Sequence, residues 1–167
     1  MTQAVDDRLA NTFRDGMAHL CAPVTIITTM DDDRPHGTTV SAVMSLSMDP
    51  PLIAIALAHT SESLEIIRRT NRFGVNILSA SQHPVAMQFA GKGRDKFLDV
   101  PWTDADGMPR ISGAAIWINC AATSFVDGGD HLIVVGAVQD VEHDTALAPL
   151  TYHGRRFGTH VPVDNQS

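Results

Sequence analysis

The sequence predicts a mainly β fold with short helices, arranged as a small β-barrel of about six or seven mostly antiparallel strands. Several short segments are rich in β-branched residues, as strands are. The residues Asp127-Gly128-Gly129-Asp130 separate two long strand-like segments and are typical of a hairpin turn. Helical spacing of apolar residues is confined to short stretches. At 167 residues the chain is expected to form a single domain, 1–167, with its core at about 8–158.

The chain is expected to open with an amphipathic helix that leads into a strand. Apolar residues recur at helical spacing, namely Leu9, Phe13, Met17 and Leu20. Asp6 or Asp7 can cap the N-terminus of this helix. Residues 24–30 are β-branched and predict a strand, and residues 31–37, with Pro35, predict a turn.

The segment from 36 to 51 is the most informative part of the chain. Small hydroxyl residues alternate with apolar ones, at Thr38, Thr39, Ser41, Ser45 and Ser47. This alternation predicts one strand, which Pro50 and Pro51 end because proline offers no N–H to a sheet. Small side chains, including Ala42, leave room for a flat ligand close to the backbone, and the hydroxyl groups can serve its polar edges. The alternative is an edge strand with its polar face in water.

A third strand and a second helix follow. Residues 52–57 are apolar throughout and predict a strand buried on both faces. Thr60 or Ser61 can cap a short helix, and the cationic Arg68 and Arg69 suit the C-terminus of that helix. Residues 72–78 predict a fourth strand.

The second half is expected to hold a helix, an irregular segment and a long hairpin. His83-Pro84 opens the helix, with proline in its first turn, and Gly91 ends it. Residues 92–113 are rich in Gly, Pro and Asp and are expected to be irregular. Residues 114–126 and 131–143 predict the two strands of the hairpin.

Composition excludes several classes of protein. A formal net charge of −7 argues against a nucleic-acid-binding protein. The longest apolar runs, such as 52–58, are too short to cross a membrane, and the first residues lack the features of a secretion signal. Cys21 and Cys120 match no metal-binding spacing, and two free thiols in a reducing cytoplasm are expected.

The positive charge is concentrated in three short clusters. Eight of the twelve basic residues lie in them, at Arg68, Arg69 and Arg72, at Lys92, Arg94 and Lys96, and at Arg155 and Arg156. An acidic protein that gathers its cations in this way can bind small anions such as phosphates. The alternative is that these cations cap helix C-termini or solvate loops.

Most catalytic motifs are absent from the sequence. The segment from Gly91 lacks the third glycine of a dinucleotide-binding fingerprint, and there is no phosphate-binding P-loop, nucleophile elbow or metal-type histidine cluster. We therefore expect no metal. Cys120 and His131 could form a nucleophile–base pair, but a mid-strand cysteine among apolar residues is more typical of an inert core.

Several motifs occur together in a specific order along the chain. They lie at 13–17, at 24–29, in the hydroxyl strand with Asp49-Pro50-Pro51, at 75–78, at 89–91 with 96–97, at 129–131 and at 152–157. This ordered combination resembles the short-chain flavin reductases, the small reductase components of two-component flavin monooxygenases. The resemblance implies a split-barrel fold and an NAD(P)H:flavin oxidoreductase that supplies reduced flavin to a separate monooxygenase. It implies FMN or FAD, NADH or NADPH, and a homodimer, whose contact surface we expect at part of Leu52 to Leu57 and at Trp117.

The resemblance also implies the residues that bind the cofactors. The flavin ring and ribityl chain would lie against Thr38, Thr39, Val40, Ser41 and Ala42, with Ser47 nearby. The segment after the third strand would meet the ribityl or phosphate through Ala58, His59, Ser61 and Ser63, although His59 departs from the family pattern. The phosphate would be closed in by Phe89, Ala90, Lys92, Arg94 and Lys96. The nicotinamide side would be formed by His131, Tyr152 and Arg156.

The chemistry implied needs no protein nucleophile, because the cofactors carry the hydride and the protein holds them in place. His131 is expected to orient the nicotinamide, and the alternative is a plain surface histidine. Two other functions remain open: a carrier or sensor that keeps flavin as a permanent group, and a split-barrel oxidase of another substrate, such as a pyridoxamine-type phosphate.

Overall fold

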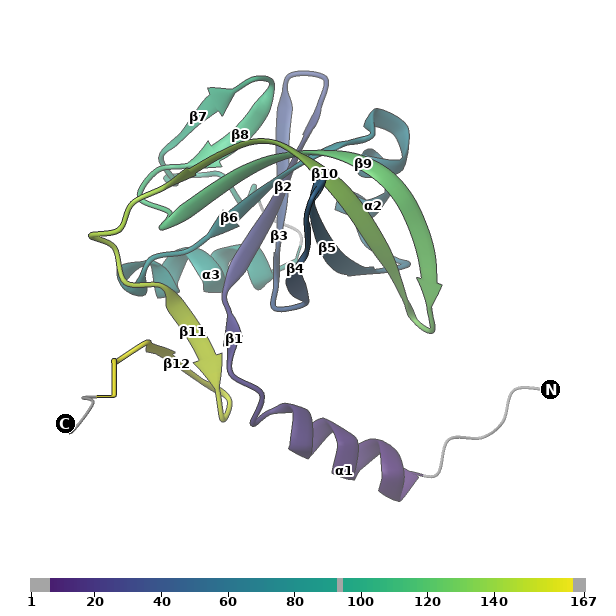
Figure 1. Ribbon diagram of the computed structural model, residues 1–167, viewed down its shortest axis with the longest axis vertical. Helices are drawn as coiled ribbons and strands as arrows, with labels where there is room; N and C mark the ends of the chain where they lie inside the picture. Colours follow the sequence, from purple (N-terminus) through teal and green to yellow (C-terminus); the bar gives the residue numbers. More distant parts are fainter. Residues whose placement is uncertain (1–6, 93–94, 164–167) are drawn as a thin grey trace.

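A seven-stranded antiparallel sheet forms the centre of the computed structural model, which describes residues 7–92 and 95–163 (Figure 1). The strand order is β3-β2-β6-β9-β10-β5-β4. The strands are β2 (Thr25–Asp31), β3 (Arg34–Val40), β4 (Val43–Met48), β5 (Pro51–Ala58), β6 (Arg72–Ile77), β9 (Ile116–Gly128) and β10 (His131–His143). Every neighbouring pair in this sheet is antiparallel. The predicted mainly β, antiparallel fold is therefore confirmed.

Short helices and two small sheets surround the central sheet. The helices are α1 (Asp7–Met17), α2 (Glu62–Thr70), the 3-10 turn η1 (Ala80–Gln82) and α3 (His83–Ala90). One small sheet has the order β1-β11-β12, from β1 (Ala22–Pro23), β11 (Leu150–His153) and β12 (Arg156–Thr159). The other pairs β7 (Trp102–Ala105) with β8 (Met108–Ile111). The three helices expected from the sequence are all present at their predicted places.

The core lies on the two faces of the central sheet, where helices cover it. Ile66 and Ile67 of α2 are buried, and Ile67 packs with Ile27 and Phe73 of the sheet. On the other side, the fully buried Phe89 of α3 belongs to a second cluster, with Ile26 of β2. Burial of this apolar surface is the main force that holds the helices to the sheet.

The predicted hydroxyl strand is wrong in one respect: it is two strands rather than one. β3 ends at Val40 and β4 begins at Val43, and the two strands lie at opposite ends of the strand order. The chain bends at Ser41 and Ala42, where Val43 N–H donates to the Ser41 carbonyl at 3.1 Å. The hydroxyl residues on the two sides of the bend, at 39 and 41 and at 45 and 47, all fall at odd-numbered positions, so their spacing suggested one continuous strand. This bend links the two edges of the curled sheet.

The segment predicted to be irregular, 92–113, contains the β7–β8 hairpin, so that prediction is partly wrong. Two buried polar side chains of the central sheet hold the hairpin. Asn76 Oδ1 accepts from the Ile111 N–H at 2.7 Å, and Thr28 Oγ1 donates to the Pro109 carbonyl at 2.7 Å. The strands are short and β8 includes a proline, so the pattern carried little strand signal.

Most of the surface expected for subunit contact is buried within the chain, and only Leu52 and Ala56 of it are half-buried. Trp117 is 2% exposed, and its ring fills the space above Gly74, where an added Cβ would lie 2.3 Å from the ring. Ile53, Ile55 and Leu57 of β5 are buried as well. Among the described residues, exposed large apolar side chains instead gather on α1 and its end, at Leu9, Phe13, Met17 and Leu20, and on β4, at Met44, Leu46 and Met48.

Within the described ranges, 7–92 and 95–163, no helix is long and apolar enough to cross a membrane.

Candidate functional site

A cavity of about 790 Å³ lies between the start of β3, the N-terminus of α2 and the segment that follows α3. Residues from all three places line it: Arg34, Pro35, His36, Gly37, Thr38, Ala58, Thr60, Ser61, Glu62, Ser63, Ala90, Gly91, Lys92, Asp95, Lys96 and Phe97. Seven of the residues implied by the resemblance are among them, namely Thr38, Ala58, Ser61, Ser63, Ala90, Lys92 and Lys96. The fold therefore brings together segments that are up to about 60 residues apart in the sequence, as between Gly37 and Lys96.

The chemistry of this lining suits a phosphate group. The hydroxyl of Ser61 caps α2 by accepting from the Leu64 N–H at 3.4 Å, so the first turn of the helix opens at the cavity. Helix N-termini carry partial positive charge and unpaired N–H groups, which favour anions. Arg34 and Lys92 add full positive charge to the same lining.

Lys96 links β3 to α3 at the cavity through two hydrogen bonds. Its ammonium donates to the Gly37 carbonyl of β3 at 3.2 Å and to the Phe89 carbonyl of α3 at 2.9 Å. Partial burial lowers the pKa of Lys96, and the nearby Glu62 opposes that shift. An ammonium has three N–H donors, so two serve the protein and one remains for a ligand.

Three predicted residues lie beside the cavity without lining it. Thr39 donates its hydroxyl to the Ala86 carbonyl of α3 at 2.8 Å. Val40 packs against the core. Phe89 is fully buried and packs edge-to-face on Phe97, with ring centroids 4.9 Å apart. These side chains support the wall of the cavity.

The remaining hydroxyl-strand residues lie at the bend and on the edge of the sheet. Ser41 and Ala42 are exposed, and Ser47 is half-buried on β4 opposite Leu52. β3 and β4 are both edge strands, but β4 exposes the apolar Met44, Leu46 and Met48, so the alternative of an edge strand with only its polar face in water does not describe it. Arg94 lies outside the described residues.

The tip of the β9–β10 hairpin lies next to the end of β5. His131 pairs with Ala58, a residue that lines the cavity. Nδ1 of His131 lies 2.7 Å from a carboxylate oxygen of Asp130, and this contact holds the pKa of Asp130 below its usual value. His59 Nε2 lies 3.9 Å from Asp127. Two imidazoles beside two carboxylates therefore stand at one end of the cavity.

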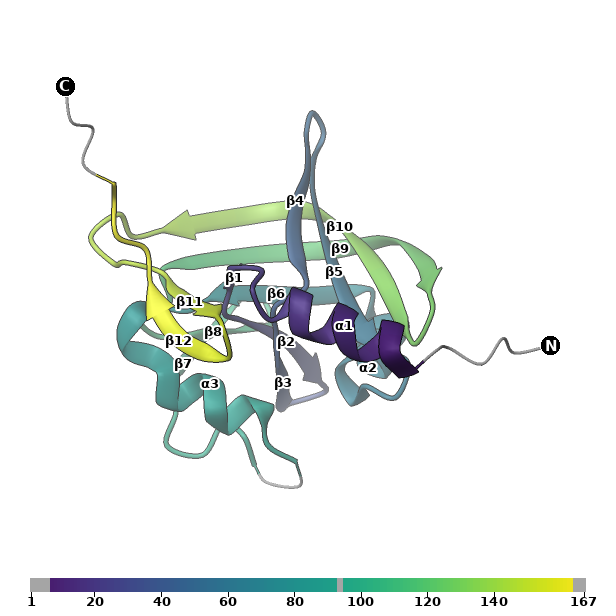
Figure 2. The ribbon, with the colours of Figure 1, turned by 90° about the horizontal axis from the view of Figure 1, so that it is seen from below.

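Within one folded chain, Tyr152 and Arg156 do not lie near His131. They lie on β11 and β12, and both views of the molecule place these strands on the side opposite the hairpin tip (Figures 1 and 2). Tyr152 packs edge-to-face on Phe157, at 5.3 Å between ring centroids.

Several lining residues were not predicted from the sequence, above all Arg34, His36 and Glu62. Arg34 and His36 fall in the turn predicted at 31–37, and Glu62 falls at the start of the predicted second helix, where the sequence did not single it out. Their closeness to predicted residues was the one available signal, because each adjoins a segment that the resemblance implicated.

Three residues of the other two basic clusters make contacts within the protein. Arg69 pairs with Asp31 at 2.5 Å, and Arg72 donates to the Asp106 carbonyl. Arg155 pairs with Asp15 of α1 at 2.6 Å. The middle cluster is thus the one placed at the cavity, through Lys92 and Lys96.

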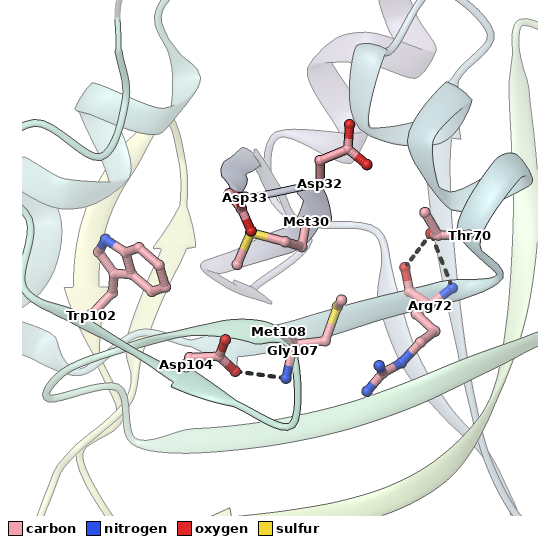
Figure 3. A pocket seen from close by; sticks show the side chains of 9 residues that line it. All are labelled: Met30, Asp32, Asp33, Thr70, Arg72, Trp102, Asp104, Gly107 and Met108. Carbon is pink, nitrogen blue, oxygen red and sulfur yellow. Dashed lines mark hydrogen bonds between the residues drawn. The ribbon is translucent and has the colours of Figure 1, made fainter.

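A second hollow, of about 460 Å³, has the opposite charge (Figure 3). Asp32, Asp33 and Asp104 line it against a single cation, Arg72. Figure 3 shows the two methionines, Met30 and Met108, in the middle of the hollow and Trp102 to one side of it. Such a lining repels phosphate, so this hollow does not suit a nucleotide phosphate.

The alternative based on Cys120 is not supported. Cys120 is buried and pairs with Val138, seven positions along β10 from His131, and burial raises the pKa of its thiol to about 12. Both cysteines are free, and within 7–92 and 95–163 no group of His, Cys, Asp and Glu could hold a metal ion.

Comparison with known proteins gives a consistent picture. The model of the flavin reductase like domain family matches residues 17–160. Over 162 residues the chain is 36% identical to the reductase subunit HsaB of a flavin-dependent monooxygenase from Mycobacterium tuberculosis, covering 95% of this chain and 85% of that protein.

Solved structures of similar proteins superpose on nearly the whole of this chain. A homologue of nitrilotriacetate monooxygenase component B from Mycobacterium thermoresistibile has a TM-score of 0.91 at 32% identity, covering 98% and 93% of the two chains. The NADH:FAD oxidoreductase SgcE6 of Streptomyces globisporus, solved with NAD and FAD fragments, has a TM-score of 0.89 at 28% identity, covering 98% and 100%. The predicted split-barrel fold is thereby confirmed.

Proposed function

The chain belongs to the family of flavin reductase-like domains, and from this membership we propose that it reduces FMN or FAD with NADH or NADPH and supplies the reduced flavin to a partner monooxygenase. The observation that carries the proposal is the cavity, in which small side chains, a helix N-terminus and cations meet beside the His131 hairpin.

The described residues fit the phosphate end of a flavin nucleotide. Arg34 and Lys92 supply positive charge, Ser61 and Ser63 lie at the first turn of α2, and Thr38 adds a hydroxyl group. Gly37 lets β3 pack closely against Phe89 of α3, because a Cβ at this position would lie 2.6 Å from the Phe89 ring. We propose that these residues hold the flavin phosphate and ribityl chain, with the ring toward Ser41 and Ala42.

Bound flavin and nicotinamide supply the hydride acceptor and the hydride donor, so the protein has to position and shield them. We propose that His131 orients the nicotinamide. The ionised Asp130 carboxylate accepts from Nδ1–H of His131, which leaves Nε2 as an acceptor for an amide or hydroxyl of the dinucleotide. The carboxylate thus fixes the imidazole, and no proton has to leave the ring for hydride transfer.

We also propose a homodimer, on two observations. The helix α1 buries none of its residues and projects from the body of the molecule (Figures 1 and 2). With β4 it presents a set of exposed apolar side chains, which monomeric proteins rarely leave uncovered. A second copy could also bring Tyr152 and Arg156 to the His131 end of the cavity, where a single chain does not place them. Light scattering should give twice the chain mass, and Phe13→Asp should lower it.

The colour of the pure protein and its activity toward NAD(P)H distinguish the competing functions. A reductase that uses flavin as a substrate should be colourless when pure and should oxidise NADH after FMN, FAD or riboflavin is added. A carrier or sensor should be yellow and inert toward NAD(P)H. Parallel steady-state assays with the three flavins and both nicotinamide cofactors also establish which pair is preferred.

The cytoplasm is the proposed site of action, since the free Cys21 and Cys120 suit a reducing compartment. That residues 1–167 form one domain, with a core at about 8–158, stays a prediction.

A further inference from the structure

A carboxylate lies at the edge of a cavity whose lining includes three cations. Glu62, the first residue of α2, lines the same cavity as Arg34, Lys92 and Lys96. The other acidic residue in the lining is Asp95. A site that has to hold a doubly negative phosphate gains nothing from a carboxylate at its edge, so Glu62 requires a separate explanation.

His36 holds Glu62 at this place. The carboxylate of Glu62 lies 3.4 Å from Nδ1 of His36, whose side chain is only 10% exposed. His36 is fixed within β3, opposite Thr29 of β2, and its other ring nitrogen is buried without a hydrogen-bond partner. Of the two ring nitrogens, Nδ1 is thus the one that has a polar neighbour, and that neighbour is Glu62. The same carboxylate also acts on Lys96, since its charge raises the pKa of that ammonium.

We infer that Glu62 sets how tightly the cavity holds a phosphorylated flavin, weakening it so that the flavin exchanges as a substrate instead of staying as a permanent group. This inference rests on the proposed function, because it needs the flavin phosphate in this cavity. The carboxylate repels the phosphate and partly neutralises the cations that attract it. Because riboflavin has no phosphate, neither effect should change the affinity of the cavity for riboflavin.

The exposure of Glu62 determines how strongly its charge can weaken FMN binding. Glu62 is 74% exposed, so water screens its charge and the repulsion is modest. We expect Glu62→Gln to bind FMN about three- to tenfold more tightly, with slower FMN dissociation. The gain should shrink in high salt, where exposed charges are screened.

The chain offers a matched control. Glu65 is in the same first turn of α2, is exposed, and carries the same charge, but it does not line the cavity. Glu65→Gln changes the net charge and the helix terminus as Glu62→Gln does. It should leave the affinities for both flavins unchanged.

The experiment titrates FMN and riboflavin separately into the full chain, following the quenching of flavin fluorescence. Four proteins are compared at low and high salt: wild type, Glu62→Gln, Glu65→Gln and Lys92→Ala. Thermal melts of each variant establish that it is folded. The expected result is tighter FMN binding in Glu62→Gln alone, with riboflavin affinity constant.

Two results would overturn the inference, and they can be told apart. If Lys92→Ala weakens FMN specifically while Glu62→Gln equals wild type, the phosphate lies in the cavity but Glu62 does not control its affinity. If neither variant distinguishes FMN from riboflavin, the phosphate lies elsewhere, and the proposed placement fails together with the role of Glu62.

Discussion

Nδ1 of His131 lies 2.7 Å from the carboxylate of Asp130, at the tip of the hairpin that joins β9 and β10. The backbone N–H of His59 donates to the Asp130 carbonyl at 3.2 Å, so the tip is also tied to the end of β5. Because His131 pairs with Ala58, which lines the cavity, the contact with Asp130 holds this imidazole beside the proposed flavin site.

His131→Ala should impair use of the nicotinamide and leave flavin binding nearly unchanged. We expect a higher KM for NADH and hydride transfer that is about ten- to a hundredfold slower, equivalent to about 1.4–2.7 kcal/mol of transition-state stabilisation. Stopped-flow reduction of bound flavin measures this directly. An unchanged rate and NADH dependence would make His131 an ordinary surface residue.

Lys92 and Lys96 should behave differently when replaced by alanine. Lys92 is exposed at the cavity, so water screens its charge, and its loss should weaken FMN binding by about 0.5–1 kcal/mol and riboflavin binding hardly at all. Lys96 joins the carbonyls of Gly37 and Phe89, so its loss should also lower stability and weaken both flavins. Flavin titrations combined with urea unfolding separate the two patterns. Identical behaviour of the two variants would contradict this division.

Asn76 should be among the most sensitive positions for stability. Its amide donates to the Ile26 carbonyl and Thr28 Oγ1 and accepts from the Ile111 N–H, all in the buried core. Asn76→Ala should lower the free energy of unfolding by about 2–4 kcal/mol, because buried partners lose their hydrogen bonds. Asn119 is a matched control on the neighbouring β9: it is equally buried, but its Oδ1 has no partner. Equal losses for the two alanine variants in urea unfolding would refute the explanation.

Cys120 should be unreactive in the folded protein. Its thiol has a pKa of about 12, so almost none is thiolate at pH 8, whereas Cys21 is exposed. A thiol reagent should modify one cysteine per native chain and two after unfolding. Because the folded state raises this pKa, its contribution to stability is present below about pH 9 and is lost as pH rises toward 12. Rapid modification of two thiols in native protein would disprove the prediction.

The sequence predicted most strands and helices because their patterns are local. The turn at 127–130 and the apolar run at 52–57 each specify an element without reference to the rest of the chain. The bend at Ser41 was missed because the hydroxyl residues on both sides of it share one two-residue spacing. The β7–β8 hairpin was missed because its stability comes from Asn76 and Thr28, far away in sequence.

The site shows the same limit. Lys92 and Ser61 were found through motifs, but Arg34 and Glu62 enter the cavity only because β3 and α2 meet there in space. Neither residue type is unusual in a turn or at a helix start, so no local pattern marks them. Local sequence patterns do not show which segments pack together in space, so these two residues could not be predicted from them.

The most direct test of the central claim is an anaerobic single-turnover experiment. The purified protein is mixed with one equivalent of FMN and excess NADH, and the flavin absorbance is followed with time, beside the same mixture without protein. We predict that the flavin absorbance is lost rapidly and only with protein present, with one NADH consumed per FMN. Flavin that stays oxidised, with NADH and NADPH alike and with FAD in place of FMN, would contradict the assignment of this protein as a flavin reductase.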